Sequence, residues 1–242
     1  MQPDFTYLIE KLDLSTPLIG VYDTNEDPLF TNYKEPDPSK HVCFFAYYKS
    51  WINGKMTRLS ESNYGCGGCG SWWFDQTTRS REEYLDFLAN EEGLKASEEL
   101  MGEWFDKVKR FRPKNRYLFV GPLVEEAYDS LETVTFFVNP DQLSALFTGA
   151  QYHSKPSDPA PVVAEFGSGC MEMLTLVSPY KEPKAMIGSM DMAMRQYLPP
   201  EIIAFTVNKP MFERLCKLDE KSFLGKPFLQ NLRKYRGGSL QS

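Results

Sequence analysis

The sequence lacks a long hydrophobic run and a targeting segment. These two absences argue against a membrane protein and against a secreted one. No stretch of the 242 residues approaches the roughly 18 consecutive apolar residues that a membrane helix needs. The N-terminus has no positively charged, apolar segment of the secretory kind. There are five cysteines, and an odd number disfavours a disulfide framework. We therefore expect a cytoplasmic protein with no membrane partner.

Positively charged residues are fewer than negatively charged ones. Lys and Arg number 27 against 33 Asp and Glu, which gives a net charge of -6 and argues against a nucleic-acid partner. The imbalance is local, because residues 117–154 contain no Lys or Arg whereas residues 209–236 are rich in both. These segments are expected to be two solvated faces, which could also attract a second copy in a homo-oligomer.

Several catalytic signatures are missing. The chain has two histidines, no Gly-x-Ser-x-Gly elbow and no Gly-Lys-Ser or Gly-Lys-Thr phosphate loop. Gly65, Gly67 and Gly70 match a dinucleotide fingerprint by letter, but a polar segment precedes them instead of the required hydrophobic strand. The sequence therefore assigns no enzymatic reaction.

The composition is that of an ordinary globular protein, with 42% hydrophobic and 25% charged residues. Such a chain can bury a large core without disulfides, so we expect one α/β or α+β domain over residues 1–242. Hydrophobic periodicity and capping residues predict helices over 3–12, 80–88, 97–111 and 170–177. Apolar and β-branched runs predict strands over 18–22, 42–48, 56–59, 117–120, 162–166 and 185–187.

The second half contains a strand–Asn–Pro–helix pattern twice. Residues 132–146 match residues 201–215 at a constant spacing of 69, with Asn139 and Asn208 suited to capping a helix. The pattern predicts two pseudo-repeated strand–helix halves, with the repeat around 120–150 and 187–218. Because this device is common, a chance likeness remains an alternative.

The strongest functional candidate is Gly65-Cys66-Gly67-Gly68-Cys69-Gly70. A Cys-x-x-Cys spacing lets two thiolates bind one metal, and Cys43 and Cys170 could complete a four-thiolate site for zinc or an iron–sulfur cluster. A redox dithiol without metal is the second interpretation, although no helix is expected after Gly70, where thioredoxin-like sites have one. The third is a glycine turn with two buried cysteines. Cys216 is expected to be a packing residue.

Aromatic residues near this loop suggest another function. Trp72, Trp73 and Tyr47, with Arg195, could line a pocket for a planar or anionic small molecule. In a chain with 34 aromatics, ordinary core packing is the competing interpretation.

The central segment resembles a known family. Val120-Gly121-Pro122-Leu123, followed by residues 134–143 (VTFFVNPDQL), is similar to the signature of the uncharacterised ArCR family, domain of unknown function 169. The resemblance implies a single-domain, cytoplasmic, prokaryotic protein and supplies no activity. Family members typically carry a second Gly-Cys-Gly-Gly-like turn, where this chain has Ser189 in place of cysteine. That difference weakens any ligand role for the second turn.

The sequence thus favours a protein that binds a metal through Cys43, Cys66, Cys69 and Cys170, or that carries a redox dithiol at Cys66 and Cys69. The alternative is a non-catalytic small-molecule-binding module.

Overall fold

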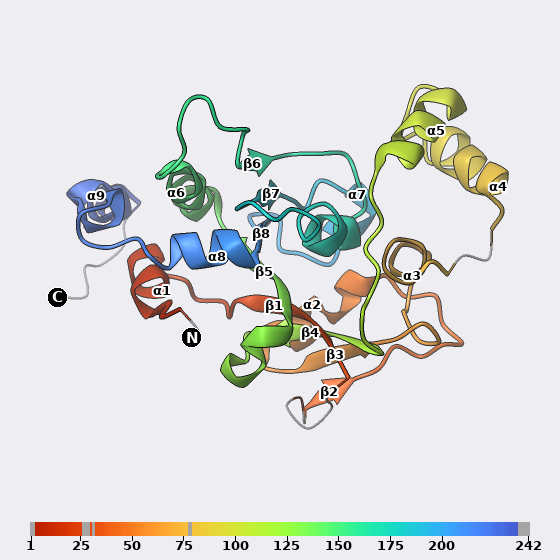
Figure 1. Ribbon diagram of the computed structural model, residues 1–242, viewed down its shortest axis with the longest axis horizontal. Helices are drawn as coiled ribbons and strands as arrows, with labels where there is room; N and C mark the ends of the chain where they lie inside the picture. The colour runs from red at the N-terminus through yellow and green to blue at the C-terminus, as the bar shows by residue number, and fades with distance from the viewer. Residues whose placement is uncertain (1–2, 26–29, 31, 77–78, 237–242) are drawn as a thin grey trace.

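The computed structural model describes residues 3–25, 30, 32–76 and 79–236. Within them, eight strands form one mixed sheet that carries helices on both faces (Figure 1), which confirms the expected mixed fold class. The strands are β1 (Ile19–Thr24), β2 (Tyr33–Lys34), β3 (Met56–Leu59), β4 (Tyr117–Pro122), β5 (Leu131–Val138), β6 (Val162–Val163), β7 (Ala185–Ile187) and β8 (Ile203–Asn208).

The order of the strands has a simple pattern. Across the sheet it is β2-β3-β4-β1-β5-β8-β7-β6. From the central pair outwards, one half therefore reads β1-β4-β3-β2 and the other β5-β8-β7-β6. The outer pairs β2–β3 and β6–β7 are parallel, and the remaining neighbours are antiparallel.

Each face of the sheet packs against its own hydrophobic cluster, because successive strand side chains point to opposite faces. Tyr22, Val134 and Phe136 face one cluster, whereas Val21 and Phe137 face the other. The first cluster is covered by α1 (Thr6–Leu12), α6 (Pro140–Gln151) and α8 (Lys209–Leu215). The second is covered by α2 (Tyr48–Ile52), α3 (Gly67–Phe74), a π-helical turn (Met171–Thr175) and α7 (Met192–Arg195).

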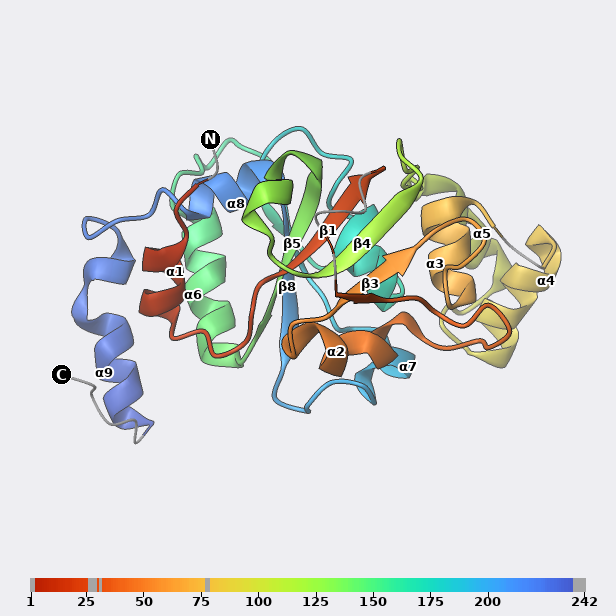
Figure 2. The same ribbon diagram turned by 90° about the horizontal axis from the view of Figure 1, so that it is seen from below.

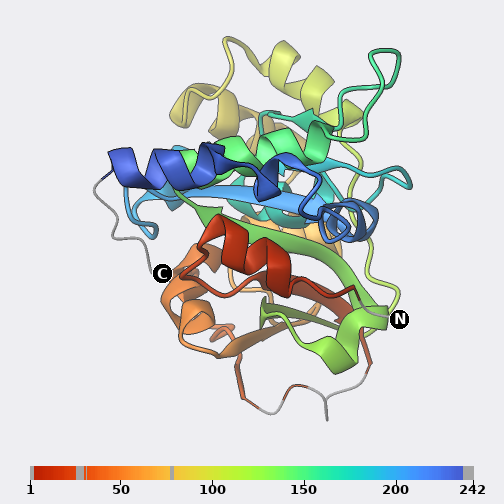
Figure 3. The ribbon, with the colours of Figure 1, turned by 90° about the vertical axis from the view of Figure 1, so that its left-hand side faces the viewer.

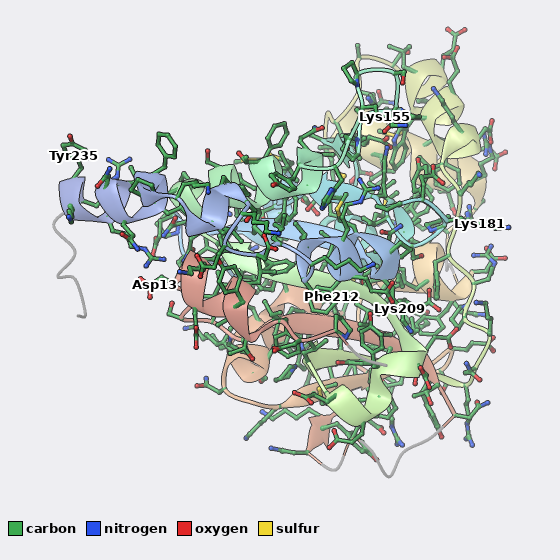
Figure 4. The ribbon with its side chains drawn as sticks, turned by 60° about the vertical axis from the view of Figure 1, so that its left-hand side comes forward. Asp13, Lys155, Lys181, Lys209, Phe212 and Tyr235 are labelled. Carbon is green, nitrogen blue, oxygen red and sulfur yellow. The ribbon has the colours of Figure 1, made fainter. Side chains whose placement is uncertain are left out.

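The remaining helices lie at the two ends of the molecule. Figure 2 shows α9 (Pro227–Tyr235) beside α1 and α6 at one end, and α4 (Arg81–Asp86) and α5 (Glu98–Lys107) beside α3 at the other. Figure 3 looks from the α9 end, with α1 in front of the sheet. Tyr235 projects from α9 at the periphery and is 89% exposed (Figure 4). None of the helices in the described part of the chain combines the length and apolar character that crossing a bilayer requires.

Both strand–Asn–Pro–helix units are present as β5–α6 and β8–α8. The Asn139 side chain accepts a hydrogen bond from the Gln142 N–H (2.9 Å), and Asn208 accepts one from the Met211 N–H (3.0 Å). The two strands pair antiparallel, with Phe136 opposite Phe205. The units are therefore neighbours in the sheet, while a duplication of the two halves remains a prediction.

Two local predictions were wrong. Residues 42–48 do not form a strand, because Phe44–Tyr47 is a 3₁₀ turn that continues into α2. A short apolar run looks the same in a buried strand and in a buried helix, so its periodicity could not separate them. The expectation that no helix follows Gly70 was wrong as well, since α3 begins at Gly67 and continues to Phe74 despite the poor helix propensity of glycine. Burial of Trp72, Trp73 and Phe74 in the core stabilises this helix.

Candidate functional site

The start of α3 positions the Cys-x-x-Cys motif. Cys66 has extended backbone angles (φ -125°, ψ 159°) and occupies the N-cap position, and Cys69 lies in the first helical turn. The backbone N–H of Cys69 therefore points back at the Cys66 sulfur and donates a hydrogen bond to it. The Phe44 N–H donates a second one. Thus a helix start and the adjoining 3₁₀ turn both stabilise negative charge on Cys66.

Cys170 lies beside the Cys-x-x-Cys motif although it belongs to a different segment of the chain. It lies at the start of the helical turn that continues into Met171–Thr175, and its sulfur is 3.2 Å from the Ser168 hydroxyl oxygen. A β-carbon on Gly68 would lie only 3.1 Å from the Cys170 sulfur. One on Gly169 would lie 2.6 Å from the Phe45 ring. The glycines around both cysteines therefore permit the close approach of the two segments.

Three thiols form one hydrogen-bonded cluster. The thiols of Cys170 and Cys69 donate hydrogen bonds to the Cys66 sulfur, and with the backbone N–H groups they hold its pKa well below the usual value, against the opposing effect of burial. Cys66 is therefore the cysteine of the cluster that loses its proton most readily.

The two donors keep their protons. Burial, and then the contacts with the other two sulfurs, raise the pKa of Cys69 well above the usual value. Donation to Cys66 is the main reason that the pKa of Cys170 is raised, while hydrogen bonds from Cys69 and Ser168 act in the opposite direction. Of these two donors, Cys170 has the better-stabilised anion, because Cys69 and Ser168 lower its pKa.

Cys43 lies beside this cluster. It is half-buried at the N-cap of the Phe44–Tyr47 turn, so its expected position on a core strand was wrong. Burial raises its pKa to about 11, and the negative charges of Cys66 and Asp191 add to the effect. It is a protonated neighbour of the thiolate.

All five cysteines are free. Within the described residues, no group of three or more histidine, cysteine, aspartate or glutamate side chains is arranged to hold a metal ion. Cys216 packs at the end of α8, where burial raises its pKa to about 12.

Comparison with known proteins gives a family. The sequence pattern of the uncharacterised ArCR family, a domain of unknown function, matches residues 7–217. The chain belongs to this family. All the cysteines lie inside the matched region, whereas α9 lies outside it. No curated protein and no solved structure matches the chain.

The four residues expected to line a ligand pocket in this ArCR protein have other partners. Trp72 and Trp73 are 2% and 0% exposed and pack in the core beneath α3. Tyr47 is half-buried in the 3₁₀ turn. Arg195 donates hydrogen bonds to the carbonyl oxygens of residues 199, 200 and 202. The aromatic pocket stays a prediction.

Glu172 is a buried residue of the ArCR site that was not predicted from the sequence. Glu172 is 1% exposed, and its carboxylate accepts hydrogen bonds from the backbone N–H groups of Ser189 (2.5 Å) and Met190 (3.1 Å). Burial raises its pKa to about 7 despite these bonds. The sequence does indicate a buried carboxylate here, because Glu172 is the single charged residue of the apolar run 170–177.

The Glu172 contact ties the second turn to the cysteine cluster. Ser189 has a positive φ of 67°, a conformation that costs energy for a residue other than glycine. Asp191, in the same turn, accepts a hydrogen bond from the Gly169 N–H at 3.1 Å, next to Cys170. The turn around Ser189 thus supports the helix start that holds Cys170.

Proposed function

We propose that the protein is a thiol–disulfide redox protein in which Cys66 is the nucleophile. The observation that supports this is the convergence of two thiols and two backbone N–H groups on one sulfur, which lowers the pKa of Cys66. A thiolate is the reactive form of cysteine in disulfide exchange. A low-pKa cysteine at a helix N-cap with a buried second cysteine three residues on is also the arrangement of dithiol redox sites.

The reaction would proceed by two exchanges. The Cys66 thiolate attacks one sulfur of a substrate disulfide, the substrate S–S bond breaks, and one substrate thiolate leaves while the other sulfur stays bonded to Cys66. That leaving thiolate takes the proton of Cys170. The Cys170 thiolate then attacks the Cys66 sulfur and expels the second substrate thiolate. Two electrons pass from the protein to the substrate, and a Cys66–Cys170 disulfide forms.

Cys170 is the resolving cysteine in this scheme for an electrostatic reason. Its anion would accept hydrogen bonds from Cys69 and Ser168, whereas the neighbouring sulfurs only raise the pKa of Cys69. The resolving step needs a thiolate, so the cysteine whose anion is better stabilised attacks faster. Cys69 then acts as a hydrogen-bond donor to whichever sulfur is charged.

A metal centre is the second candidate, supported by the convergence of three cysteines from two segments. Zinc or an iron–sulfur cluster would use Cys66, Cys69 and Cys170, with Cys43 as the fourth ligand. It would require Cys66, Cys69 and Cys170 to rearrange, because no described group of three is placed to hold a metal, and Cys43 to turn towards them.

Analysis of one anaerobic preparation distinguishes the redox site from the metal centre. Protein prepared anaerobically is analysed for zinc and iron and by visible absorbance, and is then alkylated over a range of pH with each cysteine followed by mass spectrometry. We expect metal-free protein in which Cys66 reacts first, well below the pH at which Cys216 reacts.

Oxidation with a small disulfide supplies the second measurement. We expect a Cys66–Cys170 bridge in the wild type and in Cys216→Ser, and a trapped mixed disulfide on Cys66 in Cys170→Ala. Stoichiometric metal would favour the second candidate, and five thiols that react alike would contradict the redox proposal.

A further inference from the structure

A strongly basic segment connects α5 to β4. Residues 107–116 include six Lys and Arg and no acidic residue, in a chain whose net charge is -6. The segment leaves the end of α5 without regular secondary structure and runs along one side of the molecule down to β4 (Figure 1). Positive charge is therefore concentrated on one surface of an acidic protein.

This segment forms one wall of an open groove. The groove has a volume of about 610 Å³, and its lining includes Arg81, Lys109, Arg110 and Arg112. Phe105 and Val108 supply apolar surface between these cations. It therefore combines positive charge with a small hydrophobic surface.

The cations of the groove outnumber the carboxylates that neutralise them. Asp106 pairs with Arg81 at 2.7 Å. Asp75 is shared by Arg110 and Arg112, at 2.5 and 3.0 Å. Among the described residues no ion pair is found for Lys109, which is exposed. Four cations thus face two carboxylates, both of which are about half exposed or more.

Two of the guanidinium groups are held in place by aromatic rings. Arg110 lies over Phe105 at 4.9 Å and over Trp72 at 5.5 Å, and Arg81 lies over Phe105 at 5.5 Å. Because Trp72 is buried, its ring is a fixed support. Guanidinium groups that are positioned in advance lose less conformational entropy when an anion binds.

We propose that this groove binds a small polyanion with phosphate or carboxylate groups. The planar guanidinium fork matches both groups and binds them through paired hydrogen bonds. The ligand would meet the charge of Lys109 and that of Arg112, which shares Asp75 with Arg110, with its apolar part on Val108 and Phe105.

The groove is separate from the thiol site. None of the cysteines is among the residues that line the groove. The proposal therefore goes beyond the redox function and does not depend on it.

Calorimetric titration of the full chain with tripolyphosphate and with citrate tests the proposal. At low salt we expect one site per chain for at least one of these probes, weakened by added NaCl. Lys109→Gln/Arg112→Gln should reduce the affinity by about tenfold or more. Lys114→Gln/Arg116→Gln is the matched control, because it removes the same charge from the same segment outside the groove.

The two probes distinguish phosphate from carboxylate recognition. All four substituted side chains are exposed, and a thermal melt verifies that both variants are folded. Equal losses in the two double variants would mean that binding depends only on overall charge and would overturn the proposal. No binding of either probe, or binding of a single-stranded RNA oligonucleotide alone, would overturn it as well.

Discussion

At the scale of single residues, the chemistry of the site depends on which sulfur carries the charge. On Cys66 the hydrogen bonds that favour a thiolate outweigh burial, whereas the pKa values of Cys43, Cys69 and Cys170 are shifted towards the protonated form. The difference does not come from burial alone, because every one of these sulfurs is at least half-buried. It comes from the direction in which the donors point.

Removal of the principal donor should therefore change the reactivity of Cys66. In Cys170→Ala we expect the pKa of Cys66 to rise by roughly 1 to 2 units, since a hydrogen bond to a charged group contributes about 1.5–3 kcal/mol. Cys170→Ser keeps a donor and should restore most of the shift. The pH dependence of the alkylation rate measures both, with Cys216→Ala as control, and an unchanged Cys66 profile in Cys170→Ala would contradict the assignment.

Glu172 should make stability depend on pH. Its pKa of about 7 in the folded state lies above the ordinary 4.5, so its contribution is fully present below about 4.5 and is lost as the pH rises through 7. Between pH 5 and 8 we expect the wild type to lose about 2–3 kcal/mol of unfolding free energy relative to Glu172→Gln. Urea unfolding at both pH values measures this change, and a difference that does not vary with pH would contradict it.

At the scale of elements, the two Asn caps look equivalent in sequence and differ in their surroundings. Asn139 forms a capping box with Gln142 in a half-buried position. Asn208 is 1% exposed, accepts a hydrogen bond from the Lys184 N–H as well, and donates to the carbonyl oxygens of Tyr180 and Glu182. One residue caps a helix, whereas the other also holds the loop before β7.

The two alanine substitutions should therefore differ in cost. Asn139→Ala should lower the unfolding free energy by about 1 kcal/mol, the ordinary cost of a lost cap. Asn208→Ala leaves several buried backbone groups without partners and should cost about 3 kcal/mol or more. Chemical denaturation of the two variants compares them directly, and equal losses would show that the additional bonds of Asn208 contribute nothing.

The same elements show why part of the fold could be predicted from the sequence. The caps Asn139 and Asn208 depend on residues three positions apart, so local reasoning found them. The start of α3 depends on burial of Trp73 against Phe44, a contact that the sequence does not contain. The poor helix propensity of its glycines therefore gave the wrong prediction.

At the scale of the whole molecule, the site depends on contacts between distant segments. The sequence singled out Cys66, Cys69 and Cys170 as candidates, and the structure brings these three together across more than 100 residues of chain. It could not supply the direction of the hydrogen bonds. The basic segment 107–116 was not among the sequence-based predictions, and its groove also includes Arg81 of α4, a neighbour that the sequence does not show.

The two ends of the sheet determine how molecules can meet one another. The edge strands β2 and β6 are two residues long, and β2 presents Lys34. An edge this short offers too few free backbone groups for a strand of a second molecule to add on, and an edge lysine opposes such addition further. Concentrated protein should therefore resist aggregation through its sheet, so any self-association would use the helical faces.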